Sequence, residues 1–119
     1  MPARLRLASP AEVTAALAAS PRNEEQTRLL VKHFMAVLEG RAPGRSVEVR
    51  VPPYAAVQAV EGVRHTRGTP PAVVETDAET WLALAVGALT FADAERAGKL
   101  RASGERADLT PYLPLVEDG

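Results

Sequence analysis

Apolar residues recur with a helical period in the segment 24–38. Leu30, Phe34, Val37 and Leu38 stand at i, i+4, i+7 and i+8, which places them on one side of a helix. The charged residues on the opposite side are Arg28, Lys32 and Glu39. The spacing therefore predicts an amphipathic helix whose apolar stripe needs a sheet or another helix to cover it.

A shorter helix is predicted before this one, near the start of the chain. Ser9 is followed by Pro10, and Glu12 stands three residues after the serine, which is the pattern of a capping box with proline at the first helical position. The residue before a proline avoids the helical region, so this helix should end near Pro21.

After residue 44 the apolar period changes from 3.6 to 2. In "SVEVRV" (46–51) three valines alternate with Glu48 and Arg50, which predicts a half-buried strand. A weaker strand is predicted over 54–60, and Glu61-Gly62 reads as a tight hairpin turn into a third strand at "VRHT". "AVVET" and "KLRAS" are expected to form two further strands.

The second half of the chain alternates helix signals with these last strands. Thr76 and Glu79 read as a capping box in front of an apolar helix through Trp81 to Val86. Thr90 with Asp93 predicts a short helix, closed by a glycine at 98. A closing helical segment is predicted over 107–115.

These elements predict one α+β domain over 1–119, in which 1–22 form an N-terminal helix and its lead-in. The expected sheet is small, five-stranded and mostly antiparallel, and helices are expected to cover one face of it. An antiparallel sheet of this kind buries only one face.

Composition removes several classes of function. Fourteen basic residues against fifteen acidic ones leave a net charge of −1, so no overall field attracts nucleic acid. The chain has no cysteine, which excludes disulfides and thiolate chemistry and agrees with a cytoplasmic protein. No window reaches the roughly 20 apolar residues of a membrane span. Partners of these kinds and cofactors are not expected.

Catalytic and metal-binding patterns are weak. No serine stands in a nucleophile elbow, and "GRAPGRS" follows a helix and precedes a strand, the reverse of a phosphate-binding loop. His33, between Leu30 and Phe34, is expected to be a partly buried structural residue. One minor alternative is a site formed by His65, Glu75 and Asp77, but Asp77 is already explained by a helix start.

The basic stretch "RHTRGTPP" (64–71) is the clearest polar feature. Strand alternation divides its charges between two faces, with Arg64 on one and His65 and Arg67 on the other. The favoured interpretation pairs Arg67 with Glu75 or Asp77 across the Pro-Pro turn. The alternative is a site for an anionic head group, with arginines as bidentate donors.

The segments "SVEVRVPPYAAVQ" and "RHTRGTPPAVVETDAETWLALAVGALTFADAERAGKLRASGERADLTPYLPL" together resemble the bacterial branch of the sterol carrier protein family. The best match covers 46–115. It includes "TD", the "WLxL" helix, "GxL" and the final "GxLxAxG" pattern, and "HTRGTPP" and "GERADL" resemble the bacterial branch in particular.

The resemblance implies a five-stranded sheet with helices around an apolar tunnel that holds lipid-like molecules. The side chains expected to line that tunnel are Phe34, Leu38, Trp81, Leu84, Phe91, Leu100 and Leu113. The polar residues expected at its rim are Arg50, Arg64, His65, Arg67, Glu75 and Asp77.

The predicted function is a non-enzymatic carrier or binding module for an apolar or amphipathic small molecule. An accessory or interaction domain with a filled tunnel, which could form a homodimer, is the alternative. A catalytic role around His65 is a third and weaker hypothesis.

Overall fold

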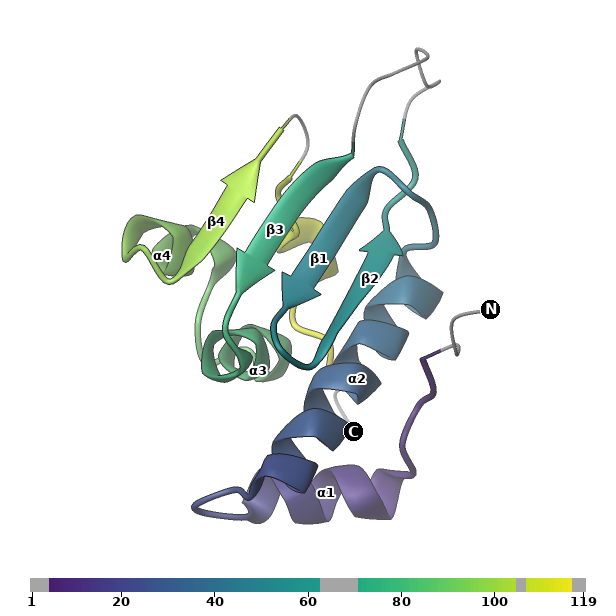
Figure 1. Cartoon of the computed structure of the whole chain (residues 1–119), viewed down its shortest axis with the longest axis vertical. Helices are drawn as coiled ribbons and strands as arrows, with labels where there is room; N and C mark the ends of the chain where they lie inside the picture. The colour runs from purple at the N-terminus through teal and green to yellow at the C-terminus, as the bar shows by residue number, and fades with distance from the viewer. Residues whose placement is uncertain (1–4, 63–70, 105–106, 117–119) are drawn as a thin grey trace.

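The computed structural model describes residues 5–62, 71–104 and 107–116. The helices are α1 (Pro10–Ala18), α2 (Glu24–Arg41), α3 (Ala78–Val86) and α4 (Phe91–Arg96). The strands are β1 (Val47–Val51), β2 (Ala55–Ala59), β3 (Ala72–Thr76) and β4 (Leu100–Ser103), and a 3₁₀ turn, η1, spans Thr110–Tyr112. Helices pack against the sheet, so the α+β class predicted from the sequence is confirmed (Figure 1).

Within the described residues the sheet has four strands in the order β2-β1-β3-β4. β1 pairs antiparallel with β2, and β3 pairs antiparallel with β4, but β1 and β3 run parallel. In the described part of the chain the sheet is thus mixed and has four strands, where five mostly antiparallel strands were expected; two of its three pairings are antiparallel. The expected strand at 63–66 lies outside the described residues.

Ser46 shows why β3 runs parallel to β1. Its N–H and its Oγ both donate to the carbonyl of Val60, just past β2, at 3.0 and 2.6 Å. Its carbonyl accepts the N–H of Ala72, the first residue of β3, at 2.9 Å. The chain thus leaves β2 and enters β3 on opposite sides of the same end of β1. The predicted hairpin turn at Glu61-Gly62 leads into 63–66, so the pairing that would define it lies outside the described residues.

The two faces of the sheet differ in polarity. The face toward α2 and α3 carries the buried side chains of Val47, Val49, Val51, Val57 and Val74. The other face carries Glu48, Arg50, Gln58, Glu75 and Arg101, which are exposed or half-buried. The alternation predicted for 46–51 is confirmed, because period 2 places every second side chain on the buried face.

The core lies between this sheet face and the helices. α2 contributes Leu30, Val31, Phe34, Met35 and Leu38, each no more than 1% exposed. The Trp81 indole, on α3, is fully buried, and its Nε1–H donates to the carbonyl of Val31 at 3.3 Å. This contact joins the two helices that cover the sheet.

One of the predicted caps is corrected by the structure. The capping box at Ser9 and the N-cap at Thr90 form as predicted. α3, however, begins after Asp77, whose carboxylate accepts the N–H of Thr80 at 2.7 Å. Thr76 does not cap α3, because it is the last residue of β3. Its hydroxyl instead donates to the carbonyl of Lys99 at 2.8 Å.

The C-terminal segment is not the helix predicted over 107–115. It forms only the turn η1 and is otherwise extended, since Pro111 and Pro114 remove two of the amide donors that a helix needs. Arg41 holds it instead: its guanidinium donates to the carbonyls of Tyr112, Pro114 and Leu115 at 2.7 to 3.3 Å.

α1 packs on α2 at the end away from the sheet, and the residues before it run back along α2 (Figure 1). No helix among the described residues has the length and apolar character needed to cross a membrane.

Candidate functional site

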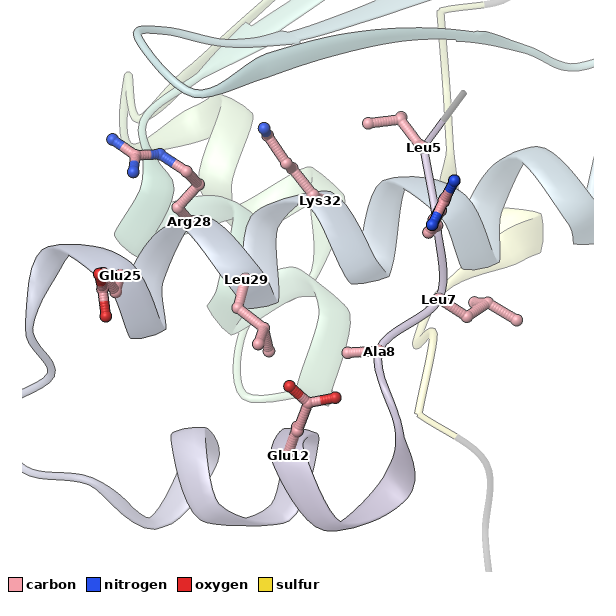
Figure 2. Close-up of a pocket in the computed structure, with 9 residues that line it drawn as sticks. Leu5, Leu7, Ala8, Glu12, Glu25, Arg28, Leu29 and Lys32 are labelled. Atoms are coloured by element: carbon pink, nitrogen blue, oxygen red, sulfur yellow. The ribbon is translucent and has the colours of Figure 1, made fainter. Parts of the chain in front are cut away.

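A cleft of about 660 Å³ lies between α2, α1 and the N-terminal segment 5–8 (Figure 2). It is larger than three other hollows, of about 230, 360 and 470 Å³. Its volume falls in the range of roughly 300–1,000 Å³ in which small-molecule sites occur. The residues that line it are Leu5, Arg6, Leu7, Ala8, Glu12, Glu25, Arg28, Leu29 and Lys32.

α2 supplies one wall through the stripe opposite its core face. Glu25, Arg28, Leu29 and Lys32 stand at i, i+3, i+4 and i+7, so they share one side of the helix. Figure 2 shows the Arg28 and Lys32 side chains extending from α2 on one side of the cleft, with Leu29 turned toward α1. The wall is therefore cationic above an apolar floor.

The N-terminal segment supplies the facing wall. It is extended up to Ser9, whose capping of α1 fixes where the chain turns. The N–H of Ala8 donates to Nδ1 of His33 at 2.9 Å, which ties the segment to α2. Leu5 is partly buried against the core cluster, whereas Leu7 is 64% exposed and extends in the direction opposite to Leu5 and Ala8 (Figure 2).

The charged groups of the cleft differ in how they are paired. Arg28 lies 3.7 Å from Glu24, and its guanidinium sits 6.0 Å from the centre of the Tyr54 ring. Glu12 accepts the N–H of Ser9 in the capping box. Neither Arg6 nor Lys32 makes an ion pair within the described part of the chain. With respect to the described residues, these two cations are therefore open to an anion in the cleft.

His33 is partly buried, as the sequence predicted. Burial lowers its pKa from the usual 6.5, because removing the ring from water penalises the charged imidazolium. Its ring packs edge-on against Phe34, with centroids 5.0 Å apart. The neutral ring is also the form that accepts the Ala8 N–H, since an imidazolium has no acceptor nitrogen.

The side chains expected to line a tunnel lie mainly in the packed core. Phe34, Leu38, Trp81, Leu84, Phe91 and Leu100 are between 0 and 4% exposed, and Leu113 is partly buried against the core. Phe91 borders the hollow of about 230 Å³ and Leu100 that of about 360 Å³. None of these residues lines the cleft of about 660 Å³.

The residues expected at a polar rim are separated by the structure. Arg50 and Glu75 lie on the sheet face away from the helices, and Glu75 stands opposite Arg50 on one side and Arg101 on the other. Arg50 pairs with Glu48, and Asp77 caps α3. Arg64, His65 and Arg67 lie outside the described residues. In the part of the chain that is described, no three side chains of His, Asp or Glu converge to hold a metal.

Sequence reasoning missed the cleft because its residues looked like an ordinary solvated helix face. Arg28 and Lys32 fit the polar side of an amphipathic helix, and the segment before Ser9 has no helix signal of its own. Two signals were available: the alternation of arginine and leucine in "RLRL" at 4–7, and Leu29 as an apolar residue on the polar side of a helix. Nothing in that alternation shows which helix it would lie on.

The model of the family described as bacterial SCP ortholog, where SCP denotes sterol carrier protein, matches residues 23–115. The chain belongs to this bacterial sterol carrier protein family. In this member of the family, α2 and all later elements fall within the matched residues, whereas α1 and the N-terminal wall of the cleft precede them.

One solved structure similar to this bacterial sterol carrier protein family member is sterol carrier protein 2 like 2 from Aedes aegypti. The two share 20% sequence identity with a TM-score of 0.34, over 90% of this chain and 97% of that one. No curated protein matches the chain.

Proposed function

We propose that this protein is a non-enzymatic binding or carrier module for an apolar or amphipathic small molecule. The family supports this proposal, because membership of a sterol carrier protein family suggests a lipid-binding carrier role. The observation that carries the proposal is the cleft beside α2, whose size suits a small molecule and whose lining combines leucines with cations. A cytoplasmic location agrees with this role and stays a prediction.

The interior positions remain part of the proposal as a second place for the apolar part of the ligand. Phe34, Trp81 and Leu84 are now packed against neighbouring side chains. A ligand would reach them only if the helices moved away from the sheet. That movement would expose apolar core surface to water, at a free-energy cost of about 25 cal/mol per Å². The open cleft needs no such movement, so we place the ligand there first.

Native mass spectrometry of the purified protein, before and after delipidation, tests the proposal. We expect a bound molecule of small mass before delipidation, and a raised melting temperature when a decyl-chain amphiphile is added back, because a ligand that binds only the folded state stabilises it. The carrier function would be contradicted if the purified protein held no bound molecule and no amphiphile changed its melting temperature.

An accessory or interaction domain with a filled tunnel is the second candidate. The observation that favours it is the dense interior, where the core-facing side chains of α2 and α3 are no more than 5% exposed: Leu30, Val31, Phe34, Met35, Leu38, Trp81, Leu82 and Leu84. Sedimentation velocity separates the two candidates: an apolar-ligand carrier keeps its oligomeric state when delipidated, whereas a domain built for association shows a concentration-dependent dimer that no amphiphile shifts.

A further inference from the structure

We infer that the cleft on the outer side of α2 is selective for single-chain amphiphiles with an anionic head, which Lys32 and Arg28 bind while the apolar chain lies between Leu29 and Leu5. This inference rests on the proposed function and adds the charge of the ligand and its place. The place is outside the layer between helices and sheet, on a surface that α2 would otherwise present to solvent (Figure 2).

The charges of the lining favour an anion. Three cations, Arg6, Arg28 and Lys32, line the cleft together with two carboxylates, Glu12 and Glu25, so the lining carries one positive charge in excess. Outside the lining, Glu24 lies 3.7 Å from Arg28, but this pair is exposed and holds the guanidinium only weakly. Glu12 is already engaged by the Ser9 N–H. Glu25 stands three residues before Arg28 and seven before Lys32, so it neighbours the arginine but lies about two helical turns from the lysine.

Lys32 and Arg28 are placed to share one head group. They stand four residues apart on α2, so their side chains are neighbours on one side of the helix. Figure 2 shows both extending in the same direction, toward the level of Leu5. Two adjacent cations repel each other, and an anion between them relieves that repulsion while it gains charge-assisted hydrogen bonds. A cationic head would add a third like charge.

The apolar part of the ligand has surface to cover on both walls. Leu29 is only partly buried on α2, and Leu5 and Ala8 come from the facing segment. Figure 2 shows Leu29 and Ala8 turned toward each other across the floor of the cleft. An alkyl chain laid between these side chains removes apolar surface from water on both sides, which is the main source of affinity for such ligands.

Three probes with the same ten-carbon chain test the inference on the full-length protein: decanoate, decanol and decyltrimethylammonium, each as monomer, by calorimetry at low salt. We expect decanoate to bind at least about tenfold more tightly than the other two, and added salt to reduce this preference by screening. Equal affinity for decanoate and decanol would overturn the anionic selectivity and leave the carrier function standing. Failure of all three to bind would overturn both.

Matched lysine variants locate the head group. The chain has two lysines, and Lys32→Gln and Lys99→Gln remove the same charge at different places. We expect Lys32→Gln to weaken decanoate about fivefold or more and leave decanol unchanged, and Lys99→Gln to change neither. Equal weakening by both variants would show a non-specific charge effect and overturn the assignment.

Two further measurements separate this site from its competitors. Methyl NMR should give contacts from decanoate to the methyl groups of Leu29 and Leu5; contacts to those of the interior residues Leu38 or Leu84 instead would overturn the placement on the outer side of α2. Flotation with anionic vesicles tests a lipid surface as the partner. Co-flotation that depends on Lys32, with no binding of monomeric decanoate, would replace the soluble amphiphile by a membrane and overturn the inference.

Discussion

The backbone N–H of Ala8 donates a hydrogen bond to Nδ1 of His33 at 2.9 Å and so fixes the N-terminal segment against α2. The two residues lie 25 positions apart in the sequence. One titratable ring therefore holds one wall of the cleft. Because only the neutral ring has an acceptor nitrogen, the wall depends on the protonation state of His33.

The stability of the protein should fall as the pH is lowered below 6.5. Burial lowers the pKa of His33 in the folded state, so the unfolded chain takes up this proton first when the pH falls. The free energy of unfolding therefore decreases as the pH falls. The stabilising contribution of the neutral His33 ring is fully present only above about pH 6.5. Urea unfolding between pH 7.5 and 5 measures this slope.

His33→Asn is the control, because the amide oxygen can accept the Ala8 N–H but does not titrate. It should keep the slow hydrogen exchange of the Ala8 amide and lose the part of the pH slope due to His33. His33→Leu should lose the protection as well, at about 0.5–1.5 kcal/mol for the missing hydrogen bond. The second histidine, His65, is present in the parent protein and in both variants, so it does not cause a difference between them. An unchanged slope in His33→Asn would contradict this prediction.

Phe34→Ala should lower the free energy of unfolding by about 3–5 kcal/mol. The Phe34 ring is 1% exposed in the layer between α2 and the sheet, so its removal leaves a cavity that the neighbours do not fill. Leu7→Ala is the matched control, since Leu7 is 64% exposed, and it should change stability by no more than about 0.5 kcal/mol. The fluorescence of Trp81 during urea unfolding reports both. A Phe34 variant as stable as the parent would show that the ring borders open space.

Gly44→Ala should be destabilising by about 1–3 kcal/mol or more. Gly44 has φ of +151°, and a Cβ there would come within 2.2 Å of the carbonyl oxygen of Val60, which is backbone and already bonded to Ser46. The end of β2 would have to shift.

Gly40→Ala is the opposite case in the same stretch of chain. Gly40 lies inside α2 with nothing within 4 Å of an added Cβ, so alanine should stabilise by about 0.5–1 kcal/mol through its better helix propensity. Melting temperatures of the two variants check the pair. Shifts of the same sign would mean that the close contact at Gly44 is relieved without cost.

Arg41→Ala should release the C-terminal segment from α2. The guanidinium donates to three carbonyls of that segment, and Arg41 is itself exposed, so we expect a loss of about 1–2 kcal/mol in total. Hydrogen exchange of Leu115 and Val116, whose amides donate to the carbonyl of Ala85, should become faster. Arg41→Lys keeps the charge but not the planar fork, so it should recover only part of this protection. Full recovery by lysine would show that charge alone holds the segment.

Local structure was largely predictable from the sequence, because its causes lie within a few residues. The capping box at Ser9, the amphipathic stripe of α2 and the alternation in β1 all act over one or two turns or one strand. The misplaced cap of α3 shows the limit. Thr76 and Asp77 both have capping side chains, and only the carbonyl of Lys99, brought close by β4, draws the Thr76 hydroxyl away.

The parallel pairing of β1 with β3 could not be predicted, because it depends on where the chain crosses the end of β1. Ser46 decides this through hydrogen bonds to residues on both sides of it, far away in the sequence. The sequence by itself thus determined the class of fold, the family and the buried faces of α2 and β1. The tertiary structure alone decided the order of the strands and the cleft, since Lys32, Leu29 and Leu5 become neighbours only when the N-terminal segment lies along α2.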